Sequence, residues 1–308
     1  MPLFRSRQPG PSPEDLQRAE RSRQLVEAGG IPLEAEERIR RQREPGAVFT
    51  SDLSVDELAA LRQLGYRPLA LVMGSSMYQI GWVQGGFSRF GGLGIGWTAP
   101  EPQENQPLTR ALTEARHLAL GRLMREAQGL GAEGVVGVRL LVRSWEWAQG
   151  MAEFTVLGTA VRREGQSGPG VPFASTLSGQ DLAKLAATGH RPLGVALGAS
   201  AWTAMAFFGG LMGGMAPWLN QEVVQFSRAL HLAQHQSRTR MAAEAAALGG
   251  SGVVGVELES HVLEYQTGSE QIQGRIVQWV ALGTVVGEGG TPAPTALPAT
   301  PRLVVPLS

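Results

Sequence analysis

The chain contains no cysteine, and Lys184 is the only lysine among its 27 lysine and arginine residues. The missing thiols exclude disulfide bonds, cysteine nucleophiles and thiolate metal sites. Basic and acidic residues are equal in number, so the formal net charge is zero. Because proteins dedicated to nucleic acid accumulate positive charge for the phosphates, we expect no nucleic-acid partner.

Long apolar segments are scarce as well. The stretch from Pro192 to Gln221 carries no charge and is long enough to cross a bilayer. Its counterpart in the repeat described below carries Gln79, Gln84 and Arg89. We therefore predict a buried strand followed by a glycine-rich loop, and no membrane partner. The amino terminus lacks the apolar core of a secretory signal, so a cytoplasmic location is expected.

The residues that are present repeat themselves. LGAEGVVGV at 130–138 returns as LGGSGVVGV at 248–256. The same holds for FTSDLS and FASTLS, which begin at Phe49 and Phe173, and for LGTAV and LGTVV near the end of each copy. We predict two copies of one unit, at 46–164 and 171–287. A charged helical or flexible segment, 1–45, precedes them, and a proline-rich disordered tail, 288–308, follows.

Each copy reads as the same series of elements. A short helix opens with an N-cap serine, Ser54 or Ser178, that has an acidic residue three positions later. An apolar strand, a long helix at about 106–128 or 220–247, and two final strands follow. This order predicts an α+β fold made of two tandem two-layer repeats, with the long helix packed on a sheet.

The helix that ends in LGAEGVVGV, followed by a hairpin that ends in GTAV, resembles the YbjQ-like family, which carries a heavy-metal-binding label. The second copy matches through LGGSGVVGV and LGTVV. The resemblance covers about 67–162 and 191–286. It implies a dodecin-subunit-like β-alpha-β-β unit and ring-like homo-oligomers, and it implies no established reaction. The fusion of two copies and the extra short helix before each depart from the family pattern.

The glycines of GLGAEG at 129–134 match the spacing of a dinucleotide-binding loop. Such a loop must follow a strand and open a helix, whereas this one closes a helix and opens a strand. We expect these glycines to serve backbone geometry and close packing.

Four polar residues recur on the long helices beside their apolar stripes. They are Arg122 and Glu126 in the first copy and Arg240 and Glu244 in the second. A carboxylate that faces the sheet needs a partner, and an arginine four residues earlier is within reach. We expect a partly buried ion pair in each copy. The alternative is a ligand or interface site that uses the pair for anions or proton transfer.

Histidines suggest a second kind of site. His231 and His235 are four residues apart on one helix and could share a divalent metal ion, with His117 as a further candidate. The first copy has Thr113 where the second has His231, so the pair is not repeated. The alternative is an exposed helical face.

No serine, histidine and aspartate set recurs in both copies, and we expect no enzyme. The leading hypothesis is a non-enzymatic assembly or binding module that forms a homo-oligomer. The alternative is a soluble protein that binds a heavy metal or a small ligand, with a divalent metal ion as the possible cofactor.

Overall fold

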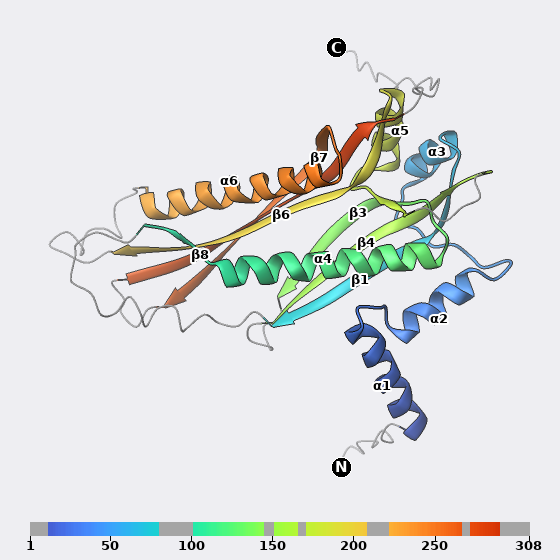
Figure 1. The fold of residues 1–308 in the computed structure, drawn as a ribbon, viewed down its shortest axis with the longest axis horizontal. Helices are drawn as coiled ribbons and strands as arrows, with labels where there is room; N and C mark the ends of the chain where they lie inside the picture. The colour runs from blue at the N-terminus through green and yellow to red at the C-terminus, as the bar shows by residue number, and fades with distance from the viewer. Residues whose placement is uncertain are drawn as a thin grey trace, which may run out of the picture.

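A computed structural model of the chain describes residues 12–79, 101–144, 151–165, 171–207, 222–266 and 272–289. It contains two four-stranded sheets, each lined by a long helix (Figure 1). The helices are α1 (Pro13–Glu27), α2 (Leu33–Gln42), α3 (Val55–Gln63), α4 (Gln106–Gly129), α5 (Gly179–Ala187) and α6 (Val224–Ala247). The strands are β1 (Tyr66–Gln79), β2 (Gln103–Glu104), β3 (Gly134–Ser144), β4 (Met151–Arg163), β5 (Phe173–Ala174), β6 (His190–Phe207), β7 (Gly252–Gln266) and β8 (Ile272–Glu288).

Two successive runs of elements have the same order. We call α3, β1, α4, β3 and β4 the first unit, and α5, β6, α6, β7 and β8 the second unit. In each unit the last strand lies between the other two and pairs antiparallel with both, in the orders β1-β4-β3 and β6-β8-β7. Helix α4 packs on β1 and α6 packs on β6. The α+β fold class predicted from the sequence is confirmed.

The short helices begin where the N-cap pattern predicts. The Ser54 hydroxyl accepts from the amide of Glu57, and the Glu57 carboxylate accepts from the amide of Ser54 at 2.7 Å. Ser178 caps α5 by accepting from the amide of Asp181 at 3.1 Å. Both caps satisfy amides that the first turn of a helix leaves unpaired. Each short helix is therefore fixed directly before the first strand of its unit.

Glycine lets the long helices approach the sheets closely. A Cβ atom on Gly74 of β1 would overlap the carbonyl oxygen of Ala119 in α4, and a Cβ on Gly198 of β6 would overlap that of Ser237 in α6. At the C-terminus of α4, Gly131 takes a φ of 69°, which favours glycine. The prediction that the GLGAEG glycines serve the backbone agrees with this geometry.

The charge-free stretch from Pro192 forms strand β6 through Phe207, and its remainder lies outside the described residues. Within the part of the chain that the structure describes, no helix is both long and apolar enough to cross a membrane. The tail predicted at 288–308 also lies outside these residues, except for Glu288 and Gly289.

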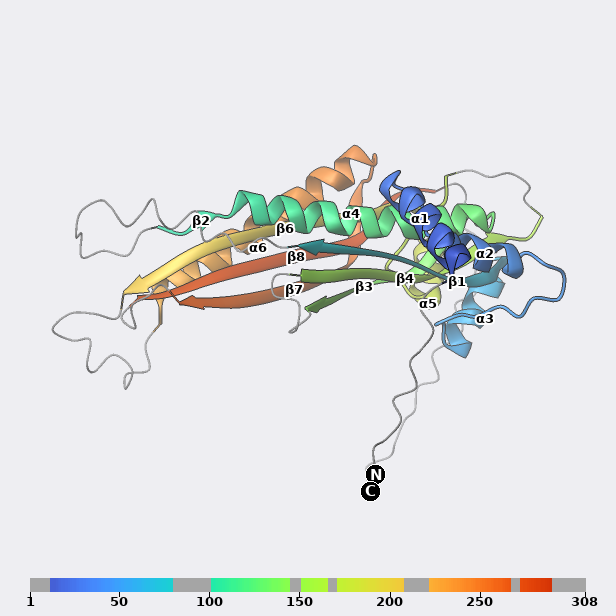
Figure 2. The same ribbon diagram turned by 90° about the horizontal axis from the view of Figure 1, so that it is seen from below.

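The N-terminal segment folds into a pair of helices that packs on the first unit (Figure 2). Ser12 caps α1 through a capping box, as its sequence indicates. Ile31 and Ile39 are buried in the same core cluster as residues of α4. The described part of the segment, residues 12–45, is thus largely helical, and Ile39 of α2 together with the preceding Ile31 anchors it to the first unit.

We predict that Gly74→Ala destabilises the fold strongly, because the added methyl group displaces α4 from the sheet. Overpacking of this kind lowers the free energy of unfolding by about 1–3 kcal/mol. Gly121→Ala on α4 is the control, since nothing lies within 4 Å of its added Cβ and alanine favours the helix. Urea denaturation measures both. Equal midpoints for the two variants would contradict the close-approach explanation.

Candidate functional site

The two units exchange short strands, and this exchange defines the candidate site. Strand β2, which precedes α4, pairs antiparallel with β6 of the second unit. Strand β5, which precedes α5, pairs in parallel with β3 of the first unit. Two-residue strands of this kind complete the edges of sheets that belong to the other unit. The first and second units are thus joined by backbone hydrogen bonds as well as by side chains.

The added strand β5 belongs to a longer bonded segment. The amide of Ser175 donates to the carbonyl of Val135, and the amide of Val138 donates to the carbonyl of Ser175, both at 2.9 Å. The amide of Gly137 donates to the carbonyl of Leu177 at 3.0 Å. We call residues 171–177 the second arm, and its equivalent before α3, residues 47–53, the first arm.

The second arm is locked in place by an aromatic ring over a glycine. The ring of Phe173 covers Gly134 so closely that a Cβ at that position would overlap it. The same ring meets Tyr66 edge-on with the ring centres 6.3 Å apart. Burial of an aromatic ring is a major contribution to such a contact. The ring of Phe173 therefore leaves no room for a side chain at position 134.

The matched arginine and glutamate residues bind the strand beneath their own helix. Glu126 accepts from the amide of Met73 at 2.9 Å, and Glu244 accepts from that of Leu197 at 2.8 Å. In parallel, Arg122 donates to the carbonyl of Ser75 and Arg240 donates to that of Ala199. These side chains hold each long helix against the strand beneath it, α4 against β1 and α6 against β6.

The expected ion pairs within each helix are wrong. Among the described residues, neither Arg122 with Glu126 nor Arg240 with Glu244 forms a salt bridge, because other residues take these roles. Arg240 pairs with Glu104 at 2.6 Å, and the imidazole of His117 lies 2.8 Å from Glu244. Both contacts cross from the first unit to the second. The alternative prediction, an interface role for Arg240 and Glu244, agrees with this geometry.

In the first unit, Arg122 and Glu126 have different partners from Arg240 and Glu244. Glu126 is buried and pairs with Arg38 of α2 at 2.5 Å. The buried Nε atom of Arg122 has no hydrogen-bond partner among the described residues. Burial, followed by the charge of Arg125, lowers the pKa of Arg122. A helix of the N-terminal segment thus stands beside Glu126, where His117 stands beside Glu244.

A groove of about 750 Å³ separates this helix pair from strand β1. Arg122, Glu126 and Arg38 line it, together with Met73 and Met77, which are exposed at the strand edge. The matching residues of β6, Leu197 and Ala201, are buried in the core cluster that contains α4. The groove therefore marks the place on β1 that corresponds to the contact of β6 with α4.

Of the candidate metal ligands, His117 is engaged elsewhere, whereas His231 and His235 stay four residues apart on one helix. His117 faces Glu244, and the hydrogen bond to that carboxylate raises the pKa of His117 against the opposing effect of burial. His231 and His235 are exposed on α6. No cluster of three or more histidine, aspartate or glutamate residues suited to a metal ion occurs within the described ranges.

One buried charged residue was not predicted from the sequence. Arg116 of α4 is fully buried, donates to the carbonyl of Leu112 at 2.9 Å and lies 4.7 Å from the centre of the Phe154 ring. Burial lowers its pKa to about 10. Its spacing of four residues after Leu112 places it on the apolar stripe, which is the signal that could have found it. The second copy has Gln234 at this position.

The equivalent strands β3 and β7 are covered to different extents. Val136, Val138 and Leu140 of β3 are 0%, 1% and 9% exposed. Their equivalents on β7, Val254, Val256 and Leu258, are 36%, 41% and 47% exposed. The same sequence motif is therefore covered in one unit and open in the other.

Comparison with known proteins places these features in a family. The encapsulin nanocompartment protein Rv1762c of Mycobacterium tuberculosis is 33% identical over 267 residues, which are 84% of this chain and 92% of that protein. The chain belongs to the same family as this mycobacterial protein. A family model described as "Putative heavy-metal-binding" (YbjQ) matches residues 103–164. The predicted YbjQ resemblance is thus confirmed for that part of the first copy.

Shorter relatives match the same kind of segment. A UPF0145 protein of Clostridium perfringens is 47% identical over 58 residues, 19% of this chain and 53% of that protein. A UPF0145 protein of Thermus thermophilus is 50% identical over 56 residues, 18% of this chain and 47% of that protein. Each match covers about half of the relative. No solved structure matches the chain.

We predict that the contact between His117 and Glu244 makes stability depend on pH. The folded state raises the pKa of His117 above its ordinary 6.5. The contribution is therefore complete below the unfolded-state pKa and is lost as pH rises through the folded value. Glu244→Gln should destabilise the chain more at pH 5.5 than at pH 8.5 in thermal unfolding.

The control for this experiment is His231→Gln, measured without added metal, which removes another exposed histidine of α6. Nuclear magnetic resonance titration of His117 gives a second readout, since its pKa should fall in Glu244→Gln. A stability difference that stays constant across this pH range would contradict the proposed charge interaction.

Proposed function

We propose that this chain is a non-enzymatic assembly module that associates with further copies of itself. The observation that carries the proposal is the one-way character of the junction. The first unit contributes β3, β2 and His117, whereas the second contributes the second arm, β6 and Glu244. A contact between two different surfaces leaves one unused copy of each surface, and such contacts build rings or open chains.

Each unit leaves one of the two surfaces unused. The second unit leaves β7, Glu222 and His235 exposed, and these are the equivalents of β3, Glu104 and His117. The first unit leaves the first arm, the edge of β1 and Arg122 without the partners that their equivalents have. A relative that spans most of this chain bears the name encapsulin nanocompartment protein, which supports a role in assembly.

We predict that the full chain elutes from size exclusion at a mass of two or more chains at micromolar concentration. Multi-angle light scattering measures this mass directly. Dilution should lower it, because associated chains dissociate by mass action. A mass of one chain at every concentration up to the solubility limit would remove the proposal.

A second proposal is divalent metal binding at His231 and His235. The description of the family model and the spacing of the two histidines on one exposed face of α6 support it. Two imidazoles four residues apart on a helix can share one borderline metal ion such as zinc or nickel. The remaining coordination positions would be filled by water or by a second chain.

We predict that zinc titrated into the wild-type chain gives a calorimetric binding isotherm that the double variant His231→Ala/His235→Ala loses. His117→Ala is the control, because His117 lies at the junction with Glu244. Identical heats from the wild type and the double variant would exclude this site.

A further inference from the structure

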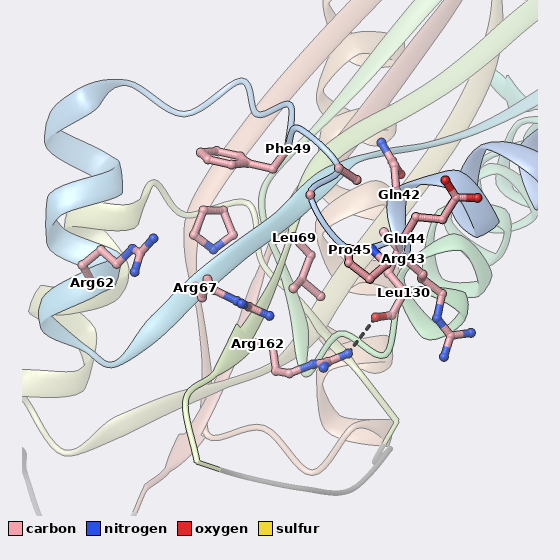
Figure 3. A pocket seen from close by; sticks show the side chains of 13 residues that line it. Gln42, Arg43, Glu44, Pro45, Phe49, Arg62, Arg67, Leu69, Leu130 and Arg162 are labelled. Carbon is pink, nitrogen blue, oxygen red and sulfur yellow. Dashed lines mark hydrogen bonds between the residues drawn. The ribbon is translucent and has the colours of Figure 1, made fainter.

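The first arm is an extended segment with an apolar side chain and no strand to pair with. Residues 47–50 are exposed, and no strand includes any part of the first arm. Phe49 is 45% exposed and lies on the rim of a cavity of about 470 Å³ (Figure 3). Its equivalent, Phe173, packs over Gly134 in the other unit. The two arms share one pattern but differ in environment.

The bases of the two arms are fixed in the same way. The hydroxyl of Ser51 lies 3.2 Å from that of Thr159 on β4, and the hydroxyl of Ser175 lies 3.2 Å from that of Thr284 on β8. These contacts hold each arm against the central strand of its own sheet. The base of the first arm is therefore held on its own unit in the same way as the base of the second arm, which pairs with β3.

The edge of β7 has the features that receive an arm on β3. Gly252 is the equivalent of Gly134, and a Cβ at Gly252 would meet only a methyl group of Val286 at 3.8 Å. The space that the ring of Phe173 fills above Gly134 is thus empty above Gly252. Gly255 takes a φ of 60° and Gly137 a φ of 64°, so the backbone bulges are also alike.

We propose that the first arm of one chain adds as a parallel strand to β7 of a second copy, with Phe49 seated over Gly252. This proposal rests on the self-association proposed above and names the surfaces that make it. By analogy with the second arm, the amide of Ser51 donates to the carbonyl of Val253, and the amide of Val256 donates to the carbonyl of Ser51. Addition to an open sheet edge supplies backbone bonds and side-chain pockets together.

Charged groups around the groove fit the same partner. In the existing junction Glu104 pairs with Arg240 and His117 with Glu244. In the second copy the equivalents are Glu222 and His235, both exposed. Glu222 would reach Arg122, whose buried Nε atom lacks a partner among the described residues. The carboxylate of Glu222 and the guanidinium of Arg122 therefore carry opposite charges.

The helix pair α1–α2 competes with the second copy for part of this surface. Arg38 holds Glu126, the residue that the incoming His235 would meet. Docking of the second copy therefore displaces α2 from Glu126, and the helix pair limits association at low concentration. Arg38→Ala should lower the concentration at which half of the chains are associated.

The test compares three full-length variants by analytical ultracentrifugation. Phe49→Ala removes the ring, and Gly252→Leu fills the space that the ring needs. Each should raise the concentration for half association by at least about ten-fold, since burial of one large apolar side chain is worth this much. Val171→Ala, which shortens an exposed side chain of the second arm outside its paired part, should behave as the wild type.

A mixture of Phe49→Ala and Gly252→Leu adds a sharper readout. The Gly252→Leu chain keeps its first arm and the Phe49→Ala chain keeps its β7 edge, so the mixture should form a complex with one chain of each. Circular dichroism spectra and thermal midpoints equal to those of the wild type show that the variants fold.

The outcomes separate the two proposals. A wild type that stays monomeric overturns self-association and the arm contact together. A wild type that associates, with both variants associating at the same concentration as the wild type, overturns only the arm contact.

Discussion

Helix α4 is buried on more than one side, and the rest of the chain is arranged around that burial. It packs on its own strand β1 and also contacts β6 of the second unit. The largest core cluster accordingly combines α4 with residues of both sheets, among them Leu197 and Leu282. Because one helix contributes to both units, this core cluster belongs to neither unit alone. The strands β2 and β5 then close the sheet edges that this helix brings together.

The same constraint explains why equivalent residues have unequal surroundings. Arg116 is buried with its guanidinium over the Phe154 ring, whereas α6 carries Gln234 at that position and leaves much of its outer face exposed. Val138 is covered and Val256 is not. The two units nevertheless share local geometry, as the glycines Gly74 and Gly198 show. A linear chain of two units, however, can cover each type of surface only once.

Features that depend on neighbouring residues in the chain could be predicted from the sequence. The capping pattern at Ser54, the turn at Gly131 and the order of elements all follow from local rules, and the structure agrees with them. The partners of Arg122 and Glu126 could not be predicted in this way. The carboxylate of Glu126 is paired with Arg38, which lies 88 positions away, so spacing along α4 carries no information about it.

The exchanged strands were beyond prediction for a related reason. Each of β2 and β5 contains two residues, which is too short for an alternating pattern, and each pairs with the other unit. The repeat nevertheless contained a clue, because FTS and FAS precede the short helices at equivalent positions. The sequence does not show that only the second of these segments pairs with a strand; the structure does.

Hydrogen–deuterium exchange at several protein concentrations tests the central claim, that the junction between the units recurs between chains, most directly. The amides of Gly137 and Val138, which donate to the second arm, should be protected at every concentration. The amides of Gly255 and Val256 should exchange fast in dilute solution and become protected as the chains associate. Fast exchange at Gly255 and Val256 in fully associated protein would contradict the account.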